Sequence, residues 1–158
     1  MEIGGLSKSE VDWDVKTITL PAERTKNNRE HVVPLSTLAL DVLARCTDKH
    51  GRDHMFGRKR GFAGWGAAKR NLDAVITLTK PWTLHDLRRT VRTGMGALGV
   101  LPHVSEAVLN HLPPKLVRTY DRNKYESEKR AALDLWAGHV RVILAKADGA
   151  NVVRTAQP

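Results

Sequence analysis

The sequence predicts a mainly helical α+β domain, with a small three-stranded antiparallel sheet near the N-terminus packed on a helical bundle. Three observations predict this class. β-branched residues gather before residue 35, and apolar residues take up a helical period after Ser36. Hydrophobic residues make up 41% of the 158 residues, which is enough for one core. We therefore expect one domain over residues 1–147 and a flexible tail over 148–158.

Three short runs before residue 35 are expected to be strands, at residues 11–13, 17–20 and 31–33. Pro21 ends the second run and Pro34 ends the third, because proline cannot donate a hydrogen bond to a strand ladder. Between these two runs, residues 23–30 contain two adjacent asparagines. Asparagine tolerates a positive φ, so this segment is expected to form the tip of a hairpin.

Helical patterns follow the sheet, and local signals mark where they begin. Ser36 is the expected N-cap of the first helix. Thr83, with Asp86 three residues later, has the spacing of a capping box, and Gly99 is expected to end that helix. The first expected helix therefore starts at Ser36. Four more helices are expected at residues 62–76, 83–98, 103–109 and 126–147.

Two of these helices carry apolar residues at helical spacing. In the helix at 62–76, the spacing of Trp65, Leu72 and Ile76 predicts a face toward the core. In the last helix, we expect the first half of an apolar stripe to pack on the same domain. Its second half, around residues 140–147, packs either there or on a neighbouring protomer. The stripe consists of Ala132, Leu135, Trp136, Val140, Ile143 and Leu144.

The chain is strongly basic, and the charge is concentrated in its middle. It holds 26 Lys and Arg against 17 Asp and Glu, a net charge of +9. Residues 41–130 alone carry 18 basic and 9 acidic side chains, including the triplet Arg58, Lys59 and Arg60 in an expected loop at 47–61. This pattern favours a polyanionic partner, most simply nucleic acid, although a solvated basic surface would look the same.

Several classes of protein are disfavoured by the composition. No apolar run approaches the ~20 residues that span a bilayer, so no membrane partner is expected. The first residues lack the basic and apolar regions of a signal peptide. The lone Cys46 allows no internal disulfide and no cysteine-cluster zinc site. We therefore expect a protein of the reducing cytoplasm.

The best local signal for chemistry is the segment His85-Asp86-Leu87-Arg88 at the start of an expected helix. His85 and Arg88 are three residues apart, so their side chains leave the same face. Helix N-termini attract anions, which makes the first turn a candidate phosphate site. The segment is short, and a match of this length also occurs without function.

Three other residues complete a candidate set: His111, Tyr120 nine residues later, and Lys26 on the expected hairpin tip. Each has an ordinary interpretation, as a helix-end histidine, a half-buried tyrosine and a solvated lysine. Together the residue types suit phosphoryl transfer without a metal, in which tyrosine is the nucleophile, lysine or histidine moves protons and arginine neutralises phosphate charge. No carboxylate cluster accompanies the histidines, so no two-metal site and no cofactor are implied.

The order of these segments resembles the catalytic domain of tyrosine recombinases, the phage-type integrases. The resemblance runs from Glu2 to about Trp136. Single segments are weak matches, whereas their order and spacing together are fairly specific. The matching segments are 2–6 (EIGGL), 9–12 (SEVD), 21–26 (PAERTK), 33–36 (VPLS), 82–90 (WTLHDLRRT), 109–111 (LNH) and 119–122 (TYDR).

The resemblance implies a site-specific DNA strand transferase that acts on double-stranded DNA, as a tetramer in the intact family. Tyr120 would attack the scissile phosphate, and Tyr125 is a rival nucleophile whose spacing from His111 fits the family less well. The resemblance implies that His85 assists the loss of the phenol proton, and that Lys26 protonates the leaving oxygen. Arg88 and His111 would hold the phosphate oxygens. The residues expected to contact DNA are Arg58, Lys59, Arg60, Arg89 and Arg92.

One departure from the family pattern concerns the start of the chain. The family has a first catalytic arginine just ahead of the segment that begins here at Glu2, so the chain resembles a catalytic domain truncated at its N-terminus. We expect weak or no recombination by these residues alone. One alternative is a DNA-binding remnant without catalysis. Another is an RNA-binding protein. With only two Phe and two Tyr, however, the chain offers few aromatic side chains on which single-stranded bases could stack.

Overall fold

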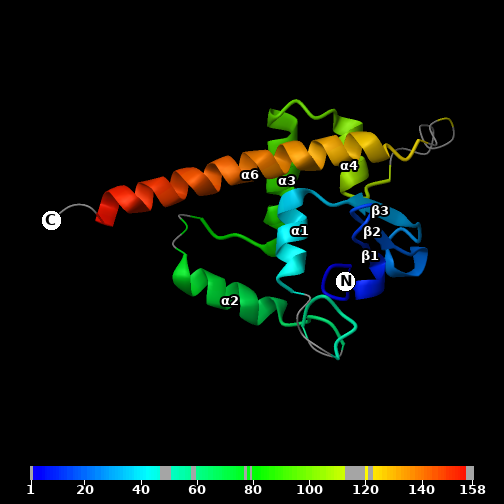
Figure 1. Cartoon of the computed structure of the whole chain (residues 1–158), viewed down its shortest axis with the longest axis horizontal. Coiled ribbons are helices and arrows are strands. Elements are labelled where there is room, and N and C mark those ends of the chain that lie inside the picture. The colour runs from blue at the N-terminus through cyan, green and yellow to red at the C-terminus, as the bar shows by residue number, and fades with distance from the viewer. Residues whose placement is uncertain are drawn as a thin grey trace.

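The computed structural model in Figure 1 describes residues 2–46, 51–57, 60–76, 78, 80–112, 120 and 123–155, with side chains as far as residue 148. Three strands, β1 (Val11–Asp12), β2 (Thr17–Leu20) and β3 (His31–Pro34), form an antiparallel sheet in the order β1-β2-β3. In the register, Ile18 of β2 pairs with Val11 on one side and Val33 on the other. This confirms the predicted sheet.

The connection between β2 and β3 is more ordered than a simple tip. A short 3-10 helix, η2 (Ala22–Arg24), follows Pro21, whose backbone is extended with a φ of −67° and a ψ of 160°. A second 3-10 helix, η1 (Lys8–Glu10), precedes β1. Asn28 adopts a φ of 52°, as the asparagine pair led us to expect for a turn.

The helices are α1 (Thr37–Ala44), α2 (Trp65–Val75), α3 (Leu84–Ala97), α4 (Pro102–Val108) and α6 (Glu126–Thr155). Ser36 caps α1, since its hydroxyl accepts from the Ala39 amide at 3.3 Å. Gly99, just after α3, has a φ of 83°, the left-handed conformation that commonly ends a helix. The predicted fold class and these two helix ends are confirmed.

Helix α6 is longer than expected, because it continues to Thr155 rather than ending near residue 147. It crosses the molecule and lies against β3, α1, α3 and α4, and its C-terminal part extends beyond these elements (Figure 1). The flexible tail over 148–158 stays a prediction.

Buried side chains gather on the two sides of this helix. One cluster joins the N-terminal segment, the sheet and α1; its buried members are Leu6, Val11, Ile18, Leu20, Leu35, Leu43 and Met55. The other lies among α3, α4 and α6, where Met95, Val104, Leu109, Ala132 and Ala137 are buried. The sheet and the helical part are therefore held together through α6.

The predicted apolar face of α2 is wrong, and that of α6 is confirmed in part. Helix α2 has no buried residue: Leu72 and Ile76 are 43% and 37% exposed, because α2 lies apart from the sheet and from α6. In α6, Leu135, Ile143 and Leu144 are about half exposed, whereas Ala132 and Ala137 are buried. Trp136, which belongs to the predicted stripe, is half-buried and lies against Gly94 of α3. The first half of the stripe therefore packs partly on the same domain, and Ile143 and Leu144 leave both interpretations of the second half open.

Candidate active site

The first turn of α3 presents two of the predicted site residues. Thr83 precedes the helix, and both its amide and its hydroxyl donate to the Asp86 carboxylate, at 2.7 and 2.8 Å. These bonds, with a further one from Arg89, lower the pKa of Asp86 to about 2. The turn is thereby fixed, with the His85 side chain exposed and Arg88 half-buried.

Arg88 reaches from α3 to the end of α4. Its guanidinium donates to the backbone carbonyl of Leu109. The carbonyls at the end of a helix have no partner within the helix, so an arginine is well suited to supply one. The same side chain that is expected to hold a phosphate therefore also joins two helices.

His111 is placed by the way α4 ends. Asn110 has a φ of 55°, its amide donates to the Ala107 carbonyl, and the His111 amide donates to the Glu106 carbonyl at 2.9 Å. This pair of bonds is a Schellman motif, and asparagine substitutes for the usual glycine at its left-handed position. His111 consequently lies directly beyond the helix end, where Arg88 also arrives.

Glu106 connects His111 to α3. Its carboxylate contacts Nδ1 of His111 and accepts from Nε of Arg92 at 2.6 Å. The hydrogen bond from Arg92, and then that from His111, lower the pKa of Glu106. The guanidinium of Arg92, which we expected to contact DNA, is thus engaged within the protein.

The loop that carries Lys26 is tied to the same helix end. The side-chain amide of Asn27 donates to both the backbone carbonyl and the side-chain oxygen of Asn110, at 3.2 and 2.8 Å. Within the loop, the buried hydroxyl of Thr25 donates to the Arg29 carbonyl at 2.7 Å and accepts from the Arg29 amide at 3.0 Å. Lys26 itself is exposed.

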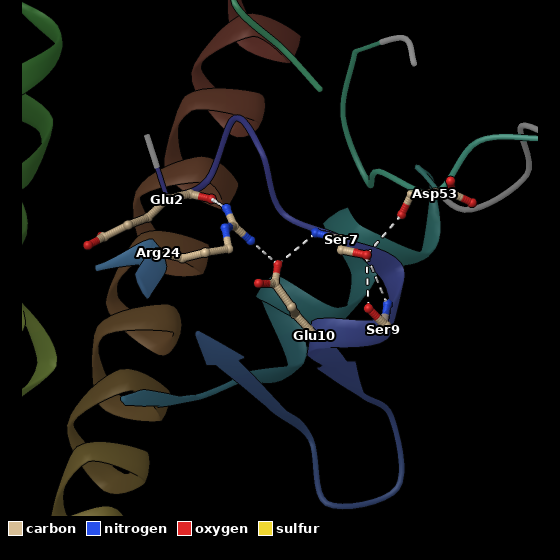
Figure 2. A network of polar contacts seen from close by, with 6 residues as sticks. All are labelled: Glu2, Ser7, Ser9, Glu10, Arg24 and Asp53. Carbon is tan, nitrogen blue, oxygen red and sulfur yellow. Dashed lines mark hydrogen bonds and ion pairs between the residues drawn. The ribbon is translucent and has the colours of Figure 1, made fainter. Parts of the chain in front are cut away.

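A polar network fastens the N-terminal segment to this loop (Figure 2). Arg24 forms an ion pair with Glu10 and donates to the backbone carbonyl of Glu2 at 2.8 Å. Glu10 also accepts from the Ser7 amide at 2.8 Å, and the Ser7 hydroxyl donates to the Asp53 carbonyl at 3.3 Å. Glu2 is therefore held beside the segment that leads to Lys26.

Two buried titratable residues beside the site were not identified from the sequence. His31 of β3 is 8% exposed and hydrogen bonds to the backbone of Val108, and its burial and then the charge of Lys129 lower its pKa. Lys129 of α6 is 4% exposed and donates to the Val32 carbonyl at 2.6 Å. Burial lowers the pKa of Lys129. The one available signal was that Lys129 lies three residues before Ala132, on the buried side of the helix.

The described contacts bring Arg88, His111 and the Lys26 loop together at the end of α4, with His85 one helical turn from Arg88. No contact among the described residues joins Tyr120 to them: its side chain is 82% exposed. Residues 113–119 and 121–122 lie outside the described part of the chain. Tyr125 is partly buried, and its ring lies 4.9 Å from that of His103.

The residues predicted to bind DNA are placed unevenly. Arg58 and Lys59 lie outside the described residues. Arg60 is exposed. The side chain of Arg89 is largely exposed, although it forms an ion pair with Asp86 at 2.8 Å.

The described residues offer neither a metal site nor a membrane span. No three His, Cys, Asp or Glu side chains within them come together as ligands of one metal ion would. No helix among them combines the length and the hydropathy that crossing a membrane requires.

Comparison with known proteins shows a family. The sequence profile of the phage integrase family matches residues 1–127. The chain is similar to the prophage integrase IntA of Escherichia coli (strain K12), with 29% identity over 92% of this chain and 35% of that protein. It is also similar to the prophage integrase IntZ of the same organism, with 32% identity over 85% of this chain and 34% of that protein. The chain thus spans about a third of each of these relatives. No solved structure matches.

Proposed function

Because this chain belongs to the phage integrase family, we propose that it is the strand-cleaving part of a site-specific DNA recombinase. The observation that carries the proposal is the meeting of Arg88, His111 and the Lys26 loop at the end of α4. These side chains come from three distant parts of the sequence. Two of them are suited to bind phosphate oxygens, and the third is suited to donate a proton.

The proposed reaction exchanges one phosphodiester for another. The phenol oxygen of Tyr120 attacks the scissile phosphorus, a 3′-phosphotyrosyl bond forms, and the bond to the 5′ oxygen breaks. His85 takes the phenol proton, which is needed because free tyrosine has a pKa near ~10. Lys26 gives a proton to the leaving oxygen. Attack by a 5′-hydroxyl reverses the step and rejoins the strands, and bond energy is conserved throughout.

Arg88 and His111 would stabilise the negative charge of the transition state, because they would contact the non-bridging phosphate oxygens on which this charge develops. Loss of one such contact costs on the order of 3 kcal/mol in activation free energy. Arg88 is held by the Leu109 carbonyl and His111 by Glu106. These contacts support the proposed roles, since they orient both side chains before DNA arrives.

Tyr120 is preferred to Tyr125 as the nucleophile. Its exposed side chain is accessible to a DNA backbone, whereas Tyr125 is partly buried against His103. Tyr120 also has the family spacing from His111.

The proposed partners are cytoplasmic double-stranded DNA and further copies of the chain. The net charge of +9 supports the first. The second is supported by α6, where Val142, Ile143 and Leu144 are each about half exposed. We propose that residues 1–158 exchange strands only weakly. The test therefore detects the covalent adduct rather than the recombined product.

The test uses a pool of end-labelled nicked duplexes in which the sequence around the nick is randomised. We expect a small fraction to become covalently attached to the protein and to survive a denaturing gel, and sequencing of that fraction gives the preferred site. The adduct should be lost in Tyr120→Phe and retained in Tyr125→Phe. Loss of the adduct only in Tyr125→Phe would contradict the assignment of the nucleophile.

The same assay separates the proposal from its alternatives. A chain that binds duplex DNA with a steep salt dependence, yet forms no adduct with any member of the pool, would be a DNA-binding remnant. A preference for single-stranded RNA over duplex DNA in a competition experiment would favour an RNA-binding protein.

A further inference from the structure

Three consecutive residues at the end of α4 are held by side chains from three other parts of the chain. His31 of β3 hydrogen bonds to the backbone of Val108, and Arg88 of α3 donates to the Leu109 carbonyl. Asn27, from the loop between β2 and β3, donates to Asn110. The end of α4 is therefore a junction that joins the sheet, the loop and α3.

Of these three contacts, that of Asn27 joins two segments that the proposed chemistry needs side by side. Asn27 follows Lys26 directly, and Asn110 precedes His111 directly. The two asparagines are 83 positions apart in the sequence, and they make two hydrogen bonds. No other hydrogen bond or ion pair among the described residues is found between the segment 25–29 and residues 109–111.

The chemistry of the pair is specific to these two residues. Both oxygens of Asn110 accept, so Asn27 must supply N–H donors, which an aspartate there lacks. Position 110 requires a residue that tolerates a φ of 55° and also offers a side-chain acceptor, and asparagine meets both requirements. Glycine at 110 would keep the backbone conformation and lose the 2.8 Å bond.

We propose that Asn27 is a positioning residue, which holds Lys26 against the phosphate-binding groups at the end of α4 through its paired hydrogen bonds to Asn110. The inference rests on the proposed function, in which Lys26 protonates the leaving 5′ oxygen. Without the pair, the exposed Lys26 loop would move relative to Arg88 and His111. The leaving oxygen would then depart without its proton donor in place.

The first experiment measures the contact itself and needs no catalysis. Hydrogen–deuterium exchange is compared between the wild-type chain, Asn27→Ala, Asn27→Asp and Asn110→Gly. We expect faster exchange in residues 25–30 and 107–112 for all three variants. The matched control is Asn28→Gly, an exposed neighbour whose φ of 52° suits glycine, and it should exchange as the wild type does. Unchanged exchange in Asn27→Ala would overturn the proposal.

The second experiment asks whether the pair acts through Lys26. The substrate is the duplex recovered from the randomised pool, made once with a normal 5′ oxygen and once with sulfur in that bridging position. A thiolate leaves without a proton, so a defect in proton donation disappears with the sulfur substrate. We expect Asn27→Ala to slow adduct formation on the oxygen substrate by about tenfold to a hundredfold. DNA affinity should stay within about twofold, because base and phosphate contacts remain.

On the sulfur substrate, Asn27→Ala should form the adduct within about threefold of the wild-type rate, as Lys26→Ala should, because neither then lacks a needed proton. An equal defect on both substrates would show a structural role only, and would overturn the proposal. If the wild-type chain forms no adduct at all, the proposed function fails. The exchange experiment then still decides whether Asn27 holds the loop to α4.

Discussion

The indole of Trp136 in α6 lies directly on the backbone of Gly94 in α3. A methyl group placed on Gly94 would sit 2.1 Å from Cζ3 of this ring and 2.8 Å from the neighbouring ring carbon. No side chain fits in that space, so glycine in the middle of α3 lets the two helices approach. The contact fixes α3, and with it His85 and Arg88, against α6.

Gly94→Ala is therefore expected to destabilise the protein, although alanine is the better helix former. Overpacking against the half-buried Trp136 ring costs about 1–3 kcal/mol in the free energy of unfolding, more than the roughly 1 kcal/mol gained in helix propensity. The measurement is the urea midpoint. The matched control is Gly96→Ala in the same helix, where the nearest atom is the end of the Arg92 side chain at 3.7 Å. Its midpoint should stay or rise, and a rise in both variants would contradict the packing argument.

Acidification should destabilise the protein through His31. Burial lowers the pKa of this imidazole below its usual 6.5, with Lys129 and Arg88 adding to the shift and Val108 and Glu2 opposing it. The folded chain then binds fewer protons than the unfolded chain below pH 6.5. Stability is full above that value, and is lost as the pH falls toward the folded pKa. Unfolding midpoints between pH 8 and pH 5 would show this fall.

His31→Gln should flatten part of that pH dependence, because glutamine keeps a donor for Val108 and does not titrate. The exposed His103 provides the control, and His103→Gln should leave the profile as it is. An identical pH profile for His31→Gln and the wild type would show that another group causes the acid sensitivity.

Loss of Lys129 should weaken the attachment of α6 to the sheet. Its ammonium donates to the Val32 carbonyl at 2.6 Å, and its aliphatic stem is buried. Lys129→Ala removes both, and we expect a loss of about 1–2 kcal/mol, since release of a buried charge offsets part of the lost hydrogen bond. Chemical denaturation tests this. Lys129→Met, which keeps the volume, should lose less, while the exposed Lys146→Ala should change little.

Self-association on DNA should depend on the extended part of α6. Replacing Ile143 and Leu144 together by serine is expected to lower the mass of the DNA-bound complex in sedimentation, because apolar area that a neighbouring copy would cover is removed. Folding should be unaffected, since both side chains are about half exposed. Lys146→Ser is the control on the same helix. Equal complex masses for the double variant and the wild type would refute docking through this surface.

Local signals in the sequence were sufficient where the interaction spans a few residues. The β-branched residues of 17–20 predicted β2. Ser36 and Gly99 predicted two helix ends, because caps and turns are satisfied by neighbours in the chain. The exposure of α2 and the buried face of α6 could not be obtained in this way. Leu72 and Leu135 have helical spacing, but periodicity does not say which neighbour, if any, covers a face.

The residue types of the candidate site were therefore available from the sequence, and their arrangement was not. The spacing of His85 and Arg88 follows from helical geometry alone, and the order of the segments identified the family. Only the tertiary structure brought Asn27 to Asn110 and His31 to Val108, and placed Lys129 beneath β3. Each of these contacts satisfies a backbone carbonyl with a donor far away in the chain, and such a partner is chosen by packing rather than by sequence separation.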